Sequence, residues 1–154
     1  MNSILSLSLL IITLFFGYNR FAHYDNMNHY PDLDFVKDMD FPKFMGVWYN
    51  IASLPNAIEK NCKCPQSVDT LEKDLVIGLS ESCIIFGKNI TSNSKAVAKT
   101  QGYGDWTNWN GPLSAPYWII KLDSNYEWVI IGQPSRKGFW IMSRKPTMEK
   151  PLLD

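Results

Sequence analysis

The three cysteines are the residues of this 154-residue chain with the most distinctive chemistry: Cys62, Cys64 and Cys83. A structural zinc site would need four ligands, and both histidines, His23 and His29, lie far upstream of the cysteines. In an oxidising compartment, three cysteines most simply form one disulfide and leave one free thiol. Because Cys83 lies across a predicted hairpin from the other two, we expect it to pair with Cys62 or Cys64. We expect no metal site and no cofactor.

Catalytic groups are sparse in the rest of the chain. A Ser-His-Asp set needs a histidine, and both histidines lie in the N-terminal segment that precedes the predicted domain. An unpaired cysteine becomes a strong nucleophile beside a base or another group that lowers its pKa, and the sequence shows no such group. Fifteen Lys and Arg balance fifteen Asp and Glu, so the chain lacks the net positive charge typical of nucleic-acid binding. These features predict a protein that is not an enzyme and binds no nucleic acid.

The N-terminal segment predicts export. Ile4–Phe16 is an apolar run without charged side chains, and its length suits a secretory signal better than a bilayer-spanning helix. We therefore expect a signal peptide over residues 1–22, a spacer over 23–39 and one domain over 40–154. The sequon that begins at Asn89 predicts glycosylation there. The protein is expected to be secreted; the alternative is a membrane tether formed by an uncleaved signal anchor.

The domain that must position these groups has an all-β pattern. From Phe44 to Arg144, short β-rich runs alternate with hairpin-length connectors of Gly, Pro, Asn, Asp and Ser. Before them, Asp40–Lys43 predicts a helical turn capped by Asp40. Short connectors join antiparallel neighbours, so the sheet should run up and down, and closure into a barrel would remove its unpaired edges. A barrel of about eight strands is wide enough to hold one small ligand.

Three motifs in this region resemble the signatures of the lipocalin family. Gly46-Val47-Trp48-Tyr49 resembles the G-x-W motif, and Asp123-Ser124-Asn125-Tyr126 resembles the second motif. Arg144, which ends the run Phe139–Arg144, resembles the basic residue of the third motif. The likeness is strongest to the branch that contains apolipoprotein D and the bacterial outer-membrane lipocalins.

The resemblance implies an up-and-down antiparallel barrel of eight strands, or of seven if the irregular stretch 104–114 replaces the fifth. The family continues past its third motif with a helix on the outside of the barrel. This chain stops at Asp154, so we expect that helix to be truncated.

The resemblance also implies how one end of the barrel is closed. Trp48 and Arg144 are expected to stack there, and Gly46 would leave room for the contact. Asp123 and Tyr126 are expected in a tight turn at the same end. These five residues are interpreted as structural and are not expected to contact a ligand.

Ligand contacts are expected at inward-facing positions of the strands. Side chains alternate along a strand, so counting by twos from Trp48 and Arg144 gives part of the wall. The pocket positions of the family map by resemblance onto the strands that flank Asp123. The expected contacts are Asn50, Ala52, Tyr117, Ile119, Lys121, Glu127, Val129, Ile131, Trp140 and Met142. This wall is mainly apolar and aromatic, and its polar members would orient a ligand.

The resemblance implies an extracellular carrier of a small hydrophobic ligand, such as a fatty acid, lysolipid, sterol, retinoid or pigment. One alternative is an interaction module whose barrel is filled by its own side chains. Another is a thiol-dependent enzyme that resembles the lipocalin-type prostaglandin D synthase, with the free cysteine as nucleophile. The outer face that the missing helix would leave bare is expected to contact a membrane surface or a second copy of the chain.

Overall fold

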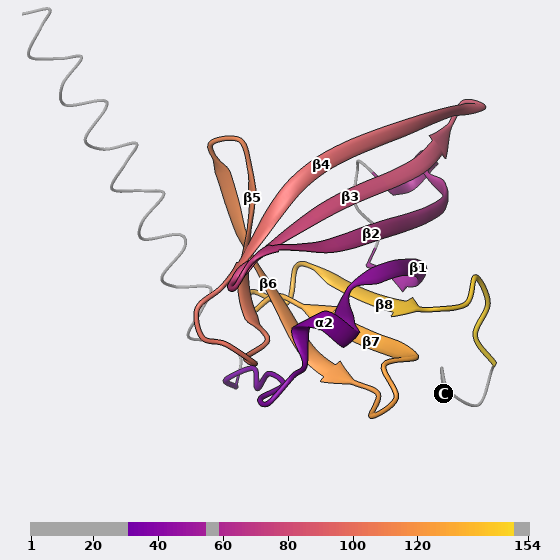
Figure 1. The fold of residues 1–154 in the computed structure, drawn as a ribbon. Coiled ribbons are helices and arrows are strands. Elements are labelled where there is room, and N and C mark those ends of the chain that lie inside the picture. The colour runs from indigo at the N-terminus through magenta and orange to yellow at the C-terminus, as the bar shows by residue number, and fades with distance from the viewer. Residues whose placement is uncertain (1–30, 55–58, 150–154) are drawn as a thin grey trace, which may run out of the picture. The chain divides into compact units, whose positions relative to one another are not determined.

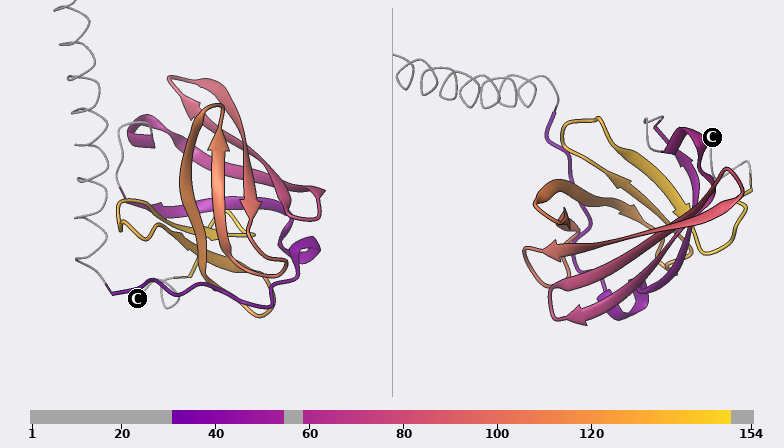
Figure 2. Two further views of the ribbon diagram at one scale, coloured as in Figure 1. Left: turned by 90° about the vertical axis from the view of Figure 1, so that its left-hand side faces the viewer. Right: turned by 90° about the horizontal axis from the view of Figure 1, so that it is seen from above.

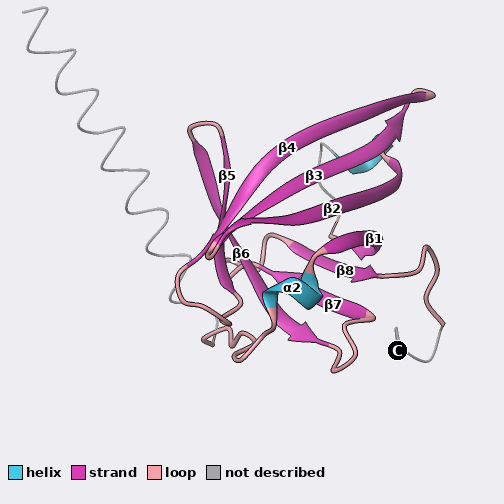
Figure 3. Cartoon of the chain, viewed as in Figure 1, coloured by secondary structure: helices cyan, strands magenta, loops and turns pink. Residues whose placement is uncertain are grey.

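The computed structural model describes residues 31–54 and 59–149, and the architecture below is that of the unit that begins at Leu33. Eight antiparallel strands form a closed barrel in which neighbours in sequence are neighbours in the sheet (Figure 1, Figure 3). The elements are α2 (Phe41–Phe44), β1 (Gly46–Ser53), the 3-10 turn η1 (Glu59–Asn61), β2 (Lys63–Lys73), β3 (Val76–Ile85), β4 (Lys88–Ala98), β5 (Asp105–Asn110), β6 (Leu113–Leu122), β7 (Trp128–Gly132) and β8 (Phe139–Ser143).

The barrel closes because β8 returns to β1. Asn50 of β1 lies opposite Met142 of β8, and the other edge of β1 pairs with β2. The expected weak point, β5, has only six residues, yet it pairs with β4 on one side and with β6 on the other. Of the two predicted forms, the eight-stranded barrel is therefore the correct one.

The connectors alternate between the two ends of the barrel, as the up-and-down order requires. The β2–β3, β4–β5 and β6–β7 connectors share one end with α2, which we call the floor. The β3–β4, β5–β6 and β7–β8 connectors lie at the opposite end, which we call the mouth. At the mouth, Phe86 and Gly87 form the β3–β4 turn with positive φ angles of 50° and 76°, which allows a two-residue hairpin. The two views of Figure 2 show the strands winding around the barrel.

The predicted helical turn forms and is capped as expected. The side chain of Asp40 accepts a hydrogen bond of 3.3 Å from the backbone N–H of Lys43, and a proline stands in the first turn. Phe41 and Phe44 on this turn are fully buried. The turn therefore projects two aromatic side chains into the floor of the barrel.

The core begins at this floor. The ring of Phe44 lies 5.1 Å from that of Trp48, and the ring of Phe41 lies 5.5 Å from that of Trp106. Both tryptophans are fully buried. These aromatic side chains form one end of the hydrophobic core, and their burial stabilises the fold.

The predictions for the two ends of the chain concern residues that the structure describes only in part. Residues 144–149 follow β8 without forming a helix, so the outer helix does not begin within the described chain. The expected signal peptide over residues 1–22 lies outside the described residues, as does most of the expected spacer. Within the described ranges, we find no helix of the length and apolar character that a bilayer crossing requires.

Candidate functional site

The floor of the barrel is closed by an indole and a guanidinium. The Cζ atom of Arg144 lies 3.6 Å from the centre of the Trp48 ring, which is the stacking that the motifs imply. The guanidinium also donates hydrogen bonds of 2.8–3.2 Å to the carbonyl oxygens of Lys43, Phe44, Val47 and Tyr126. Burial lowers the pKa of Arg144, which nevertheless remains a cation at any physiological pH. One side chain thus connects the last strand to α2, to β1 and to the β6–β7 turn.

Gly46 permits this contact for two reasons. Its φ angle is +107°, which side-chain-bearing residues rarely adopt. A Cβ atom at this position would also lie 3.3 Å from Nη1 of Arg144. The glycine of the first motif therefore provides both the backbone conformation and the space that the Arg144 side chain needs.

The β6–β7 turn lies at the same end, as expected. The Asp123 carboxylate accepts hydrogen bonds from the backbone N–H groups of Asn125 and Glu127 at 3.0 and 3.3 Å. The hydroxyl of Tyr126 accepts a hydrogen bond of 2.8 Å from the backbone N–H of Asp40. The second motif therefore holds the turn against the residue that caps α2.

Above this floor, most of the expected ligand contacts do face inward. Ile119 and Val129 are fully buried, and Tyr117 and Met142 are 8% and 7% exposed. The rings of Tyr117 and Trp140 lie 6.3 Å apart. The expected residues on the inner face are Asn50, Tyr117, Ile119, Val129, Ile131, Trp140 and Met142. Strands β6, β7 and β8 thus present an apolar and aromatic wall.

The inward orientation expected for Ala52 is wrong because β1 contains a bulge. The register with β8 shifts between Asn50 and Ala52, so Ala52 pairs with Ile141 and is exposed. Ser53 pairs with Trp140 and takes the inward position instead. A bulge inserts one residue and reverses the alternation beyond it.

The same error affects Lys121. The register of β6 with β7 shifts between Ile119 and Lys121, so Lys121 pairs with the outward-facing Ile130. Its Nζ atom lies 5.8 Å from the ring centre of Trp128 on the outer surface. Leu122 pairs with the buried Val129 and replaces Lys121 on the inner face. The inner wall therefore loses its one expected cation.

Glu127 is also placed differently from the prediction. It lies in the β6–β7 turn at the floor, ahead of β7, and its side chain is exposed. Its backbone carbonyl accepts a hydrogen bond of 2.9 Å from the N–H of Arg144. Glu127 therefore belongs to the closed end rather than to the inner wall.

The opposite part of the inner wall is polar, and sequence reasoning missed it. Ser67 and Asp69 of β2 are buried, and Asp69 lies opposite Leu79 of β3, which lies opposite Ser94 of β4. Ser67 donates a hydrogen bond to the Asp69 carboxyl. The sequence signal was an alternation of polar residues along β2 and β4. The motifs lie on β1, β8 and the β6–β7 turn, so they could not show which residues of β2 and β4 face inward.

Burial raises the pKa of Asp69 from its usual value to about 7. The hydrogen bond from Ser67 opposes this rise, the charge of Glu81 adds to it, and the charge of Arg144 opposes it. Burial also raises the pKa of Tyr117 well above its usual value, and the charges of Asp69 and Glu81 add to that rise. The acidic side chains of β2 and β3 are therefore within electrostatic reach of the aromatic wall.

Three inward-facing polar atoms have no hydrogen-bond partner within the described part of the chain. They are Oδ1 of Asn50, Oγ of Ser94 and Oδ1 of Asn108. Leaving such a group unpaired costs about 1–3 kcal/mol, so buried polar groups normally bind a protein group, a water molecule or a ligand. The inner surface therefore offers hydrogen-bonding groups that a guest molecule could engage.

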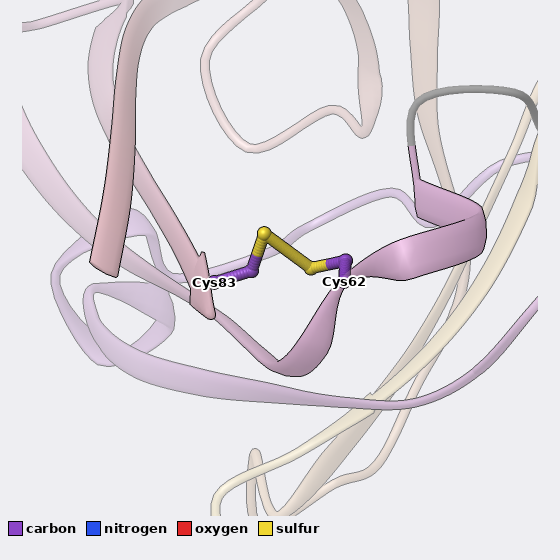
Figure 4. The surroundings of a disulfide bond; sticks show 2 residues. All are labelled: Cys62 and Cys83. Atoms are coloured by element: carbon purple, nitrogen blue, oxygen red, sulfur yellow. A yellow bond between two sulfur atoms is a disulfide. The ribbon is translucent and has the colours of Figure 1, made fainter. Parts of the chain in front are cut away.

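The disulfide lies near the mouth of the barrel, at the ends of β2 and β3 that lie there. Cys62 and Cys83 are joined, with their Cα atoms 5.5 Å apart, which resolves the choice that the sequence left open (Figure 4). Cys64 remains as an exposed free cysteine. Asn89 is exposed at the beginning of β4, one residue into the strand rather than in a loop.

A cavity of about 450 Å³ lies on the outer surface of the barrel. Most of its wall comes from outward-facing residues of β2, β3 and β4 and from Trp109 of β5. The lining residues are Val68, Thr70, Glu72, Gly78, Leu79, Ser80, Asn93, Ser94, Lys95, Trp109 and Gly111. Glu72 and Lys95 form an ion pair at its edge. Leu79 and Ser94, which the alternation of side chains places on the inner face, also contribute to its lining, and the inner-wall residues of β6, β7 and β8 do not.

Comparison with known proteins agrees with this architecture. Residues 39–154 match the family model described as a lipocalin-like domain. The chain is 30% identical over 119 residues to temperature-induced lipocalin-1 of Arabidopsis thaliana, a match that covers 70% of this chain and 64% of that protein. It is 28% identical over 120 residues to the outer membrane lipoprotein Blc of Vibrio cholerae, covering 72% and 68% of the two chains. The chain thus spans about two thirds of the length of these relatives.

Solved structures share the fold at lower identity. The cockroach allergen Per a 4 superposes with a TM-score of 0.61 at 21% identity, covering 80% of this chain and 79% of the allergen. Insecticyanin from the tobacco hornworm Manduca sexta superposes with a TM-score of 0.58 at 21% identity, covering 79% and 71%. At this identity the likeness supports the barrel fold alone.

Proposed function

This chain belongs to the lipocalin family, and from that premise we propose that it is an extracellular binder and carrier of a small hydrophobic ligand held inside its barrel. The observation that carries the proposal is that the inner wall has an apolar side and a polar side. Buried apolar and aromatic side chains on β6, β7 and β8 face polar atoms without partners on β1, β4 and β5. Such a surface suits a molecule with an apolar body and a polar group.

Burial of the apolar body would supply most of the affinity, at about 25 cal/mol per Å² of apolar surface removed from water. The closed floor determines the route by which a ligand reaches the interior. Trp48 is fully buried beneath the interior, and Arg144 fixes its other face, so a ligand must enter and leave through the mouth. No step in this mechanism requires a covalent bond to change, and we infer that the protein is a binder and not an enzyme.

Export is supported by the covalent structure. The Cys62–Cys83 disulfide is of the kind that persists in oxidising compartments. The exposed position of Asn89 is compatible with glycosylation at its sequon. The expected contact of the outer face of the barrel with a membrane surface or with a second copy of the chain also remains a proposal. Sedimentation of the chain with and without lipid vesicles would test both.

A quenching titration tests ligand binding directly. The full chain is titrated with ω-bromododecanol, an uncharged amphiphile whose bromine quenches tryptophan on contact. Saturable quenching is expected, and Trp140→Phe should remove much of it because Trp140 lies on the inner wall. Trp109→Phe is the matched control, because Trp109 lies on the outer surface and is 46% exposed. Quenching that does not saturate, or that is lost only in the Trp109 variant, would contradict the proposal.

A further inference from the structure

Two hairpins extend beyond the other strands at the mouth of the barrel. The β3–β4 hairpin and the β5–β6 hairpin both rise above β1, β7 and β8 in Figure 1 and in the left-hand view of Figure 2, which share one vertical axis. Both turns belong to the end that lies opposite the closed floor. A flat surface that approaches from this side therefore meets these two turns before it meets β1, β7 or β8.

Each of the two hairpins carries a large apolar side chain at its tip that is left in water. Phe86 is 90% exposed and Leu113 is 74% exposed, the highest values among the large hydrophobic residues that the structure describes. Ile84, Ile90 and Trp109 lie on the same hairpins and are 40–48% exposed. Apolar groups in this position add little to the core, and a cluster of them typically marks an interaction surface.

The backbone at Phe86 makes its residue type more unusual. Phe86 and Gly87 form the two-residue turn with φ angles of 50° and 76°, and the first position of such a turn favours Asn, Asp or Gly. A bulky side chain at positive φ is an outlier that costs local stability. The hairpin thus has a phenylalanine where neither the turn nor the core benefits from one, which points to a benefit outside the folded chain.

The charged side chains around the β3–β4 hairpin are lysines. Lys88 lies two residues after Phe86, Lys63 pairs with Ile84 across the sheet, and Lys60 lies on η1 just before β2. All three are exposed, and none forms an ion pair within residues 31–54 and 59–149. Residues 82–104 and 106–122 contain no acidic side chain. The two hairpins are therefore apolar at their tips and cationic or neutral behind them.

Apolar tips with lysines behind them match the chemistry of an anionic bilayer surface. Aromatic and aliphatic side chains gain free energy when they enter the boundary between headgroups and acyl chains, and lysines gain it from anionic headgroups at the same depth. A second copy of the chain is a poorer partner for this surface. Two mouths that face each other would bring the lysines of both copies together, and like charges oppose association.

We propose that the mouth of the barrel docks on an anionic lipid bilayer, with Phe86 and Leu113 inserted at the level of the acyl chains and Lys60, Lys63 and Lys88 among the headgroups. This surface differs from the outer face of the barrel considered above. The inference goes beyond the proposed function and does not depend on the identity of the ligand. It places the end through which a ligand enters directly against a membrane.

Glycosylation would oppose this docking. Asn89 is exposed three residues after Phe86, so a glycan at its sequon would occupy space that the bilayer needs. The glycan and the bilayer therefore compete for the same hairpin. The chain without a glycan is expected to dock, and a glycan on Asn89 is expected to weaken docking at least tenfold.

A fluorophore placed at the tip tests the contact directly. The full chain with Phe86→Trp, produced without a glycan, is mixed with vesicles of phosphatidylcholine and phosphatidylserine whose acyl chains carry bromine. Relative to the parent chain, the added indole is expected to shift to shorter wavelength and to be quenched. Leu71→Trp is the matched control, because Leu71 is an apolar residue that is 38% exposed near the opposite end of β2. It should show neither change.

Two further pairs of variants separate insertion from adsorption. In the Phe86→Trp chain, Leu113→Ser should reduce quenching several-fold, whereas Leu71→Ser should not. Lys88→Gln should weaken the affinity for these vesicles roughly fivefold, whereas Lys73→Gln, at an exposed position near the floor, should not. Vesicles of phosphatidylcholine alone should quench much less.

Several results would overturn the inference. They are an unquenched fluorophore at position 86, equal quenching at positions 71 and 86, equal effects within either pair of variants, and equal quenching by uncharged vesicles. Each would leave the proposed function intact, because the ligand titration contains no vesicles. Failure of that titration with normal docking would instead contradict the proposed function alone.

Discussion

Arg144 lies 3.6 Å from the ring centre of Trp48 and donates hydrogen bonds to four backbone carbonyls, three of them about 100 residues earlier in the chain. A guanidinium can do this because its planar donors point in several fixed directions at once. The contact joins the first and last strands at the point where the barrel closes. It should therefore affect the stability of the whole domain.

Arg144→Lys keeps the charge but removes the planar set of donors. Lysine would stack poorly on the indole and could satisfy only some of the four carbonyls, so we expect a loss of about 2–4 kcal/mol in the free energy of unfolding. Urea denaturation followed by fluorescence measures it. Arg136→Lys, the same substitution in the β7–β8 connector, should change stability by less than about 0.5 kcal/mol. Equal losses in the two variants would show that the stacked geometry is not important.

Gly46→Ala tests the close approach to Arg144. The substitution adds backbone strain at φ +107° and places a Cβ atom 3.3 Å from Nη1. We expect a cost of roughly 2–3 kcal/mol by thermal or urea unfolding. Gly87→Ala is the control for strain alone, because Gly87 has φ +76° with nothing within 4 Å of an added Cβ. If the two variants lose the same stability, then the contact with Arg144 adds nothing to the requirement for glycine.

Asp69 should make stability depend on pH. The folded protein keeps the proton up to about pH 7, whereas the unfolded chain releases it near the usual value of 3.8. Between these values the folded state binds more protons, so its free energy of unfolding falls as pH rises. This stabilisation is fully present when the pH is below the pKa of Asp69 in the unfolded chain, and it is lost as the pH rises through the pKa of Asp69 in the folded protein. Its upper bound is about 4 kcal/mol in the free energy of unfolding.

The measurement compares urea unfolding of the wild type and of Asp69→Asn from about pH 5 to pH 8. Asparagine keeps an acceptor for Ser67, so the difference between the two proteins isolates the carboxyl. The charged groups that act on it are Glu81 on β3, which favours the protonated form, and Arg144 at the floor, which favours the ionised form. A difference that does not change with pH, or that changes in the opposite direction, would contradict this prediction.

The sequence predicted the barrel because its signals are local. The turn residues, the cap at Asp40 and the three motifs each depend on a few neighbouring residues, and the structure contains the corresponding elements. Pairing Trp48 with Arg144 needed the resemblance, since nothing local joins residues so far apart. The partner of Cys83 could not be chosen, because Cys62 and Cys64 are close enough in sequence for either to reach it.

The inner wall was predicted correctly only where the alternation of side chains is unbroken. Counting by twos fails beyond a bulge, and the bulges after Asn50 and Ile119 turned Ala52 and Lys121 outward. Bulges have no reliable local sequence signal, so they appear only when both paired strands are known. The buried polar residues of β2 were missed because no motif shows which residues of β2 or β3 face inward. These two gaps explain why the inner wall was expected to carry Lys121 and was not expected to carry the buried Ser67 and Asp69.

The disulfide assignment predicts different results for two neighbouring cysteines. Cys62→Ser should cost on the order of 3 kcal/mol in the free energy of unfolding, because it opens a covalent loop with a sequence separation of 21. Cys64→Ser should leave stability unchanged and remove the free thiol, which a thiol titration of the unfolded protein detects. A Cys64 variant that loses the disulfide would show that Cys83 pairs with Cys64 instead.

Ser94→Ala should separate stability from binding. The serine hydroxyl is buried without a partner in the described chain, so its removal should leave the free energy of unfolding unchanged or raise it by about 1 kcal/mol. The same change should weaken binding of ω-bromododecanol several-fold, because a group that would form a hydrogen bond to the hydroxyl of the guest is gone. Ser114→Ala, at an exposed position of β6 that pairs with the outward-facing Trp109, is the control and should alter neither quantity. A Ser94 variant that is destabilised by more than about 1 kcal/mol and binds normally would show that the hydroxyl serves the fold and not the ligand.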